Sequence, residues 1–204
     1  MKIKKETTRI EGFSDGVFSI AVTLLVLDLH APTNTTFKTC DEFLRFLRSQ
    51  WPTYFALTLS FLSIFILWVN HHKIFKQIYV RNTAITFANG LILFFVSAVS
   101  YPTALLSKYY NSPLENIVVA LYTGLFTLIN LSYILLWYCA TRNKNLLIPN
   151  ITNATINKLS KNYWYGLPVY GIAFALSFIQ PVISLFLCGS LLIFWALSSG
   201  KIKD

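Results

Sequence analysis

Ionisable and hydrogen-bonding side chains are rare in this sequence, and those that interrupt its long apolar runs are the candidates for chemistry. Asp15 lies in one such run, directly after Ser14. His71 and His72 follow a second run, and Asn89 lies within a third. Carboxylates, imidazoles and amides can bind metals, transfer protons or join helices through hydrogen bonds. The spacing of these residues, and the elements that carry them, distinguish among these roles.

The patterns of enzymes and metal sites are missing from the sequence. Adjacent histidines on a helix point about 100° apart, so His71 and His72 cannot easily ligate one metal ion. The sequence contains no HExxH pattern and no glycine-flanked nucleophilic serine. Its three cysteines are far apart and include no close pair. We therefore expect no enzymatic activity, no cofactor and no resident metal ion.

The composition is that of a membrane protein. Of the 204 residues, 55% are hydrophobic and only 12% are charged, which is too apolar for a soluble domain of this length. The net charge of +9 does not indicate nucleic-acid binding, because the lysines and arginines lie between apolar runs rather than in one patch. We expect a lipid bilayer, and no nucleic acid, as the partner of this chain.

Six apolar segments are long enough to cross the hydrocarbon core as helices. They cover residues 9–29, 51–70, 84–106, 117–140, 163–179 and 181–199. Lysine and arginine favour the cytoplasmic side of short loops, and most of the 17 fall on one side of this alternation. The sequence therefore predicts one all-α domain over residues 1–204, with six transmembrane helices and both termini in the cytoplasm. A short amphipathic helix is expected around residues 41–48, in the outer connection between the first two spans.

The polar residues of the first three segments lie at the same depth in this topology. An ionisable residue within a span needs partners inside the protein, because burying an unpaired charge in lipid is costly. The candidate partners of Asp15 are Ser14, Arg9 and polar groups on other spans, of which His71 or His72 can meet it at the cytoplasmic ends of the first two spans. Asn89 on the third span would complete a buried network that holds three helices in register. Contact of Asp15 with an ion path is the alternative.

One face of the first segment is apolar except for a single hydroxyl. At about 100° per residue, this stripe contains Phe13, Gly16, Val17, Ile20, Thr23, Leu24, Leu27 and Ala31. A stripe of this kind on a membrane helix ordinarily contacts lipid or another helix. Periodicity by itself therefore does not identify a pore.

Three motifs together resemble the transmembrane protein 175 family of potassium channels. The first segment carries the run Arg9, three intervening residues, and then Phe13, Ser14 and Asp15. The second carries Trp68, two residues, His71 and His72, and the third carries Asn89, Gly90 and Leu91, followed later by Tyr101, Pro102 and Thr103. The resemblance extends over the entire chain. A single six-span unit of this length resembles the prokaryotic members, which implies a location in the plasma membrane.

The resemblance implies a homotetramer in which four copies of the first helix surround a path for K⁺. It places the narrowest ring at Ile20, extended outward by Leu24 and Leu27, while Thr23 offers its hydroxyl to a transient, partly dehydrated K⁺. The sequence has no carbonyl-filter motif, which is compatible with an apolar constriction that gates by dewetting and selects moderately for potassium over sodium. Asp28 is then either a pore entrance that concentrates cations or an ordinary solvated helix end.

Two other functions stay open at this point. A secondary transporter is one, because Gly166, Pro168 and Gly171 interrupt the fifth segment in the way that broken helices form substrate sites. The first half of the chain, however, contains no matching interruption and no inverted repeat. A purely structural membrane protein is the other.

Overall fold

The computed structural model describes residues 6–29, 31–32 and 37–199, and these residues form an all-helical fold of the membrane type. Eight α-helices and two 3-10 helices follow one another in the described ranges. In chain order they are α1 (Thr8–Leu24), η1 (Leu25–Asp28), α2 (Cys40–Ser49), α3 (Trp51–Gln77), α4 (Thr83–Ser97), α5 (Ser100–Tyr109), α6 (Glu115–Thr141), η2 (Lys144–Leu146), α7 (Asn153–Ser177) and α8 (Pro181–Ser199). The prediction of an all-α protein is therefore confirmed.

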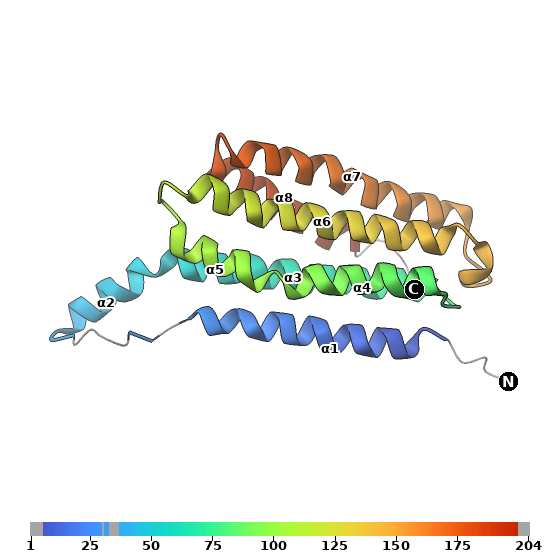
Figure 1. Ribbon diagram of the computed structural model, residues 1–204, viewed down its shortest axis with the longest axis horizontal. Coiled ribbons are helices and arrows are strands. Elements are labelled where there is room, and N and C mark those ends of the chain that lie inside the picture. The colour runs from blue at the N-terminus through green and yellow to red at the C-terminus, as the bar shows by residue number, and fades with distance from the viewer. Residues whose placement is uncertain (1–5, 30, 33–36, 200–204) are drawn as a thin grey trace.

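The long helices run side by side in layers along the longest axis of the molecule (Figure 1). α1 forms one edge and packs mainly against α3 and α4. α6 lies further inside and contacts α4, α5, α7 and α8, so the hydrophobic core surrounds this helix. Its completely or almost completely buried side chains include Tyr122, Ile129, Tyr133 and Leu136. α2 projects away from the other helices at the end of the molecule where α1 finishes (Figure 1).

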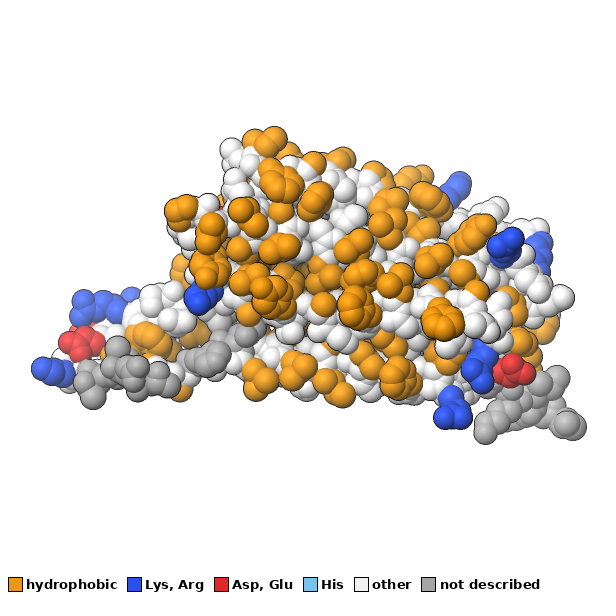
Figure 2. All heavy atoms as spheres, viewed as in Figure 1, with side chains coloured by type: hydrophobic (Ala, Val, Ile, Leu, Met, Phe, Trp, Pro, Cys, Tyr) orange, Lys and Arg blue, Asp and Glu red, His pale blue; other side chains and the backbone are white. Residues whose placement is uncertain are grey.

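The outer surface of the helices is apolar along most of its length. Figure 2 shows hydrophobic side chains over the middle of one face, with charged side chains gathered toward the two ends. By length and composition, four helical stretches in the described ranges can cross a membrane: Thr8–Leu27, Trp51–Gln77, Thr83–Tyr109 and Glu115–Thr141. The apolar part of α8, Pro181–Leu197, is shorter than these four stretches, and α7 begins with polar turns. The number of six spans therefore stays a prediction.

The third predicted span consists of two helices instead of one. The sequence predicts a single helix over residues 84–106, but α4 ends at Ser97 and α5 follows after a short break. Pro102 explains the break, because a proline has no N–H to donate to the carbonyl of Ala98, four residues earlier. The N–H of Tyr101 bonds this carbonyl instead, at 3.2 Å. Both halves remain within one apolar stretch.

The fifth predicted span begins earlier than expected and is not interrupted. The sequence predicts it over residues 163–179, whereas α7 runs from Asn153 to Ser177. Thr152 caps the start by accepting a hydrogen bond from the N–H of Thr155 at 3.2 Å. Hydropathy does not detect the added turns because they are polar. Pro168 lies inside a continuous helix, so α7 lacks the interruption on which the transporter alternative depends.

The first predicted span changes its geometry before its expected end. The sequence predicts one helix over residues 9–29, but α1 ends at Leu24 and the tighter η1 continues to Asp28. Such 3-10 turns are common at the ends of α-helices, and this one buries Leu25 completely. Ala31 lies beyond both helices, so it is not part of the helical stripe to which the sequence assigned it.

The remaining predicted segments are helical over their whole lengths. α3 continues to Gln77 instead of ending at residue 70, while α6 and α8 match their predicted bounds to within two residues. The predicted amphipathic helix is α2, and none of its residues is buried. Thr39 caps α2 by accepting a hydrogen bond from the N–H of Glu42 at 3.2 Å.

A set of backbone hydrogen bonds joins three connections at the end of the molecule where α1 begins. Ile78 and Leu147 form an isolated antiparallel bridge between the α3–α4 and α6–α7 connections. The N–H of Tyr79 bonds the carbonyl of Leu146 at 2.8 Å. The N–H of Glu6 bonds the carbonyl of Tyr79 at 3.3 Å, so the start of α1 is held to the same connections.

Candidate functional site

A buried chain of hydrogen bonds joins α1, α4 and α3 near the start of α1. Asn89 donates from Nδ2 to Oγ of Ser14 at 3.0 Å, and its Oδ1 lies 2.7 Å from Nε2 of His71. An amide oxygen can only accept, so Nε2 of His71 carries the proton in this pair. Ser14 donates in turn to the carbonyl of Ile10 at 2.8 Å. These three side chains are buried, so the network links three helices inside the subunit.

Aromatic rings enclose the histidine of this network. The ring of His71 stacks on Phe75 at a centroid distance of 4.5 Å and lies 5.3 Å from the ring of Phe18 on α1. The rings exclude water from the imidazole, and its hydrogen bond to Asn89 satisfies the nitrogen that faces α4. The environment therefore favours one fixed ring orientation.

Asp15 finds its hydrogen-bond partner on the second span, in Trp68. Its Oδ1 accepts a hydrogen bond from Nε1 of Trp68 at 2.8 Å, while the hydrogen bond of His71 goes to Asn89. Ser14 and Asp15 point about 100° apart on α1, so only one of them can face the buried network. His72 is exposed and stacks on Trp68 at 6.4 Å between ring centroids. Of the candidate partners, a polar group on the second span bonds Asp15, but this group is Trp68 and not a histidine.

Trp68 is the partner that sequence reasoning missed as a contact. It was part of the motif, and its indole N–H is a donor with no acceptor function. The sequence contains a signal for this contact. Trp68 lies three residues before His71, so both side chains lie on the same side of their helix, and the indole can only donate. Arg9 and Phe13, by contrast, are exposed and line an open groove between α1 and α4 with Arg81.

The predicted apolar stripe of α1 is exposed on the isolated subunit. Ile20 is 60% exposed, Leu24 41% and Leu27 64%. The opposite face is buried, with Phe18 and Ala21 packed into the core. α1 therefore uses one side to bind its own subunit and leaves the other side uncovered.

Thr23 places the only hydroxyl of this stripe beside Ile20 and Leu24. Its Oγ1 donates toward the carbonyls of Ser19 and Ile20, at 3.1 and 3.0 Å. The hydroxyl hydrogen is thus used within the helix, and the oxygen keeps its lone pairs as acceptors. Asp28 closes η1, and its side chain lies outside the described part of the structure.

Known proteins match this sequence and this arrangement of helices. The family model described as the endosomal/lysosomal potassium channel TMEM175 matches residues 9–99. A potassium channel of Chamaesiphon minutus is 40% identical over 97% of this chain and 97% of its own length. The chain belongs to the TMEM175 family. A potassium channel of Streptomyces collinus is 33% identical over 93% of this chain and 91% of its own length.

A solved structure supports the same assignment to TMEM175. The crystal structure of a lysosomal potassium-selective TMEM175 homologue from Chamaesiphon minutus superposes with a TM-score of 0.84 at 38% identity, covering 97% of this chain and all of that chain. The matched range of the TMEM175 model contains Arg9, Asp15, Ile20, His71 and Asn89. TMEM175 is a family of ion channels rather than of enzymes, and its helices identify this chain as an integral membrane protein.

Proposed function

We propose that this chain forms a potassium channel whose ion path is lined by α1. The observation that carries the proposal is the exposed stripe of Ile20, Leu24 and Leu27 on a helix whose other side is packed against its own subunit. Membership of TMEM175 supports the choice of a channel, because the full-length relatives are potassium channels. The stripe then faces ions rather than lipid.

Four copies of the chain would place four α1 helices around one axis. A single α1 cannot enclose a path for an ion, and its position at the edge of the subunit leaves it accessible to other copies (Figure 1). We therefore propose a homotetramer, with the side chains of Ile20 forming the narrowest ring. Leu24 and Leu27 extend the apolar neck. Leu27 belongs to the 3-10 helix η1, so its side chain points in a different direction from the one that a regular α-helix would give it.

The proposed neck selects ions by the cost of removing their water. An apolar ring gates by dewetting, since a hydrated cation must lose or deform its shell with little to replace it. K⁺ is hydrated more weakly than Na⁺, so the neck favours potassium moderately. The acceptor lone pairs of the exposed Thr23 hydroxyl would offer one ligand per subunit to a transient, partly dehydrated K⁺.

The proposed topology has six spans with both termini in the cytoplasm of a prokaryotic cell. Four stretches meet the length and composition of a span, and we assign the later turns of α7 and the whole of α8 as the fifth and sixth. α7 and α8 pack against each other as an antiparallel pair, which suits a tight hairpin through the membrane. The relatives from bacteria support the plasma membrane as the location.

The polar network at the start of α1 has a separate role in this proposal. Ser14, Asn89 and His71 would fix the depth and rotation of α1 against α3 and α4. Asp15 and Trp68 would fix the other side of the same turn. With α1 held in this way, its opposite face keeps a constant direction toward the axis of the tetramer.

Ion flux into liposomes tests the proposed path. The Ile20→Asn variant should wet the neck, raise potassium flux several-fold and weaken the discrimination against sodium. Ile193→Asn on α8 is the matched control, because Ile193 is 63% exposed and Ile20 is 60% exposed. The control should leave flux unchanged, since Ile193 faces lipid in the proposed arrangement. Equal effects of both variants, or no effect of Ile20→Asn, would remove Ile20 from the gate.

The same liposomes distinguish a channel from a secondary transporter. Passive potassium flux that follows only the electrochemical gradient supports the channel. Saturable exchange coupled to a second ion would support the transporter instead. The structure gives that alternative less support than the sequence did, because α7 continues through Pro168 without a break. Absence of flux of either kind would favour a structural membrane protein.

A further inference from the structure

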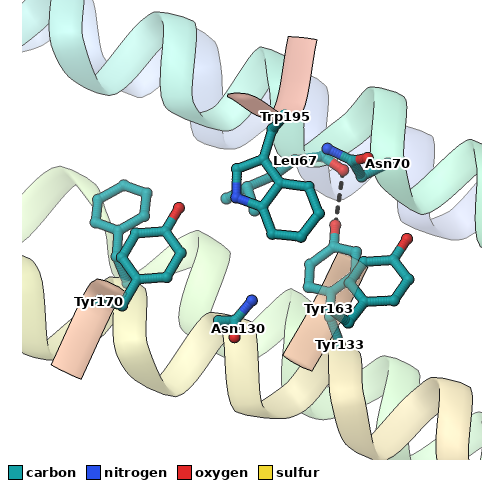
Figure 3. A pocket seen from close by; sticks show the side chains of 8 residues that line it. Leu67, Asn70, Asn130, Tyr133, Tyr163, Tyr170 and Trp195 are labelled. Atoms are coloured by element: carbon teal, nitrogen blue, oxygen red, sulfur yellow. Dashed lines mark hydrogen bonds between the residues drawn. The ribbon is translucent and has the colours of Figure 1, made fainter. Parts of the chain in front are cut away.

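An open groove of about 550 Å³ lies between α1 and α4 near the start of α1. Its lining includes two arginines and four apolar side chains: Arg9, Arg81, Ile10, Phe13, Phe87 and Leu93. Three other hollows in the described part of the chain have no charged lining residue. Figure 3 shows one of them, the pocket among α3, α6, α7 and α8, which is lined mainly by aromatic and amide side chains. The α1–α4 groove therefore differs from these three in joining positive charge to apolar surface.

The two arginines of the groove have no partner of opposite charge. Both side chains are exposed, and neither forms a hydrogen bond or an ion pair within the described ranges. The residues that line the groove include no carboxylate. Arg9 lies in the first turn of α1, which begins at Thr8, and Arg81 lies shortly before α4, which begins at Thr83. Both arginines are therefore at the ends of apolar stretches, at the depth where lipid headgroups begin.

The backbone around the groove is held in place by hydrogen bonds. Asn82 caps α4 by accepting a bond from the N–H of Ile85 at 2.8 Å, which fixes the chain next to Arg81. The bond from Asn89 to Ser14, at 3.0 Å, holds α1 against α4 beside the groove. A preformed site of this kind binds a ligand with a smaller loss of conformational entropy.

The rest of the groove is open and apolar. Phe13 on α1 is 68% exposed, and Phe87 on α4 is 75% exposed. A Cβ at Gly90 would meet no atom within 4 Å, so the groove is unfilled at this residue. The arginines need an anion, whereas the phenylalanines need an apolar cover. A phospholipid supplies both in the same order of depth, with its phosphate at the membrane surface and its acyl chains in the interior.

We propose that the groove binds one anionic phospholipid, with its phosphate at Arg9 and Arg81 and an acyl chain along Phe13, Gly90 and Phe87. The guanidinium group matches phosphate in charge and geometry, and basic pockets between transmembrane helices bind anionic headgroups. Inorganic phosphate by itself would leave the apolar lining uncovered. The inference rests on the membrane location of the chain, so its failure would leave the proposed ion path untouched.

A second copy of the chain is the competing occupant of the groove. It would have to bring a carboxylate to the depth of the arginines. Asp15 lies about 9 Å deeper than Arg9 along α1 and already bonds Trp68. Glu11 is bonded within its own subunit. Glu6 is exposed at this end of the molecule, so the test includes a variant of it.

Thermal stability in the presence of lipid tests the site. Phosphatidylglycerol, added to the purified protein in a neutral detergent, should raise the melting temperature by about 3 to 6 °C. Phosphatidylcholine and inorganic phosphate should leave it unchanged. Arg81→Gln should remove most of the shift. Arg142→Gln is the matched control and should keep the full shift, because Arg142 is exposed at the same end of the molecule but does not line the groove.

The apolar half of the site has a test that changes no charge. Gly90→Leu should fill the groove beside α4 and remove most of the shift caused by phosphatidylglycerol. Gly171→Leu on α7 is its control, since a Cβ at Gly171 also meets no atom within 4 Å. Without lipid, both variants should melt at or above the wild-type temperature, because leucine favours a helix more than glycine does. Gly90→Leu therefore keeps the test informative if an arginine variant does not fold.

Several outcomes would overturn the proposal. No shift with phosphatidylglycerol, or an equal shift with phosphatidylcholine, would exclude an anionic-lipid site. An equal shift with inorganic phosphate would assign the arginines to a free anion. An unchanged shift in both Arg9→Gln and Arg81→Gln would place the lipid elsewhere. Loss of tetramers in Arg81→Gln and Glu6→Gln alike, without any dependence on phosphatidylglycerol, would assign the groove to a second copy of the chain.

Discussion

α1 and α6 are apolar to nearly the same degree but are packed in opposite ways. Their best stretches have mean hydropathies of 1.7 and 1.8. α6 buries thirteen of its 27 residues, whereas α1 buries three of its 17. The difference follows from position, because α6 is surrounded by helices while α1 contacts its subunit on one side only. Hydropathy therefore identifies both as membrane helices and does not tell a core helix from a helix with an uncovered face.

The comparison also separates two kinds of apolar surface. The side chains of α6 contribute to stability by burial inside the subunit. The outward side chains of α1 gain little from burial in the subunit, and their apolar character suits a lipid contact as well as the proposed ion path. If the loss of an outward side chain of α1 destabilised the subunit as much as the loss of a buried side chain of α6, this distinction would be wrong.

The largest expected difference is between two isoleucine truncations. Ile129→Ala removes a side chain with 0% exposure and should cost about 2 to 5 kcal/mol of unfolding free energy. Ile20→Ala removes a side chain that is 60% exposed and should cost the subunit little. Thermal unfolding in a detergent that keeps the subunits apart is the measurement. Equal losses would mean that the stripe of α1 is packed as tightly as α6.

Two glycine substitutions should differ next most strongly. A Cβ at Gly166 would lie 2.8 Å from Asn130 Nδ2 and 2.8 Å from Cζ2 of Trp195, so Gly166→Ala should destabilise by about 1 to 3 kcal/mol. A Cβ at Gly16 meets nothing within 4 Å, so Gly16→Ala should be neutral or stabilise by up to about 1 kcal/mol through helix propensity. Melting curves of the two variants check the sign. Destabilisation of the separated subunit by Gly16→Ala would reveal a contact on the face of α1 that we describe as open.

A smaller effect is expected from the polar turn of α1. Asp15→Ala removes the acceptor of the Trp68 hydrogen bond and should reduce the recovery of tetramers in mild detergent. Trp68→Phe removes the donor and should act in the same direction. Asp41→Ala on the exposed α2 is the control carboxylate and should leave recovery unchanged. Normal tetramers with altered permeation in Asp15→Ala would instead place Asp15 in the ion path.

The last test concerns topology and involves no change in stability. Cys40 is an exposed, unpaired thiol at the start of α2, in the connection that we place outside the cell. A membrane-impermeant maleimide should label it in intact cells, and Cys40→Ser should abolish that labelling. Labelling only after the cells are opened would reverse the orientation of α1 and of the whole subunit.

Prediction from the sequence succeeded where the cause is local and failed where it depends on neighbours. Apolar runs located α6 and α8 to within two residues, because a chain in lipid must satisfy its backbone as a helix. The break before Pro102 was visible in the sequence, since the missing N–H is a local property, and it was overlooked. The polar start of α7 was missed because hydropathy reports solvent preference rather than helix length.

The sequence by itself determined that this protein is a helical membrane protein, and it determined which turn of the first helix is polar and which face is apolar. It also placed Asp15 at the depth of His71, through the alternation of charged loops. Only the tertiary structure decided that Asn89 forms a hydrogen bond with His71 while Trp68 forms one with Asp15. Depth along the membrane follows from the order of residues in the chain. The rotation of each helix about its axis is set by packing against helices that are distant in sequence, and this rotation decides which side chains meet.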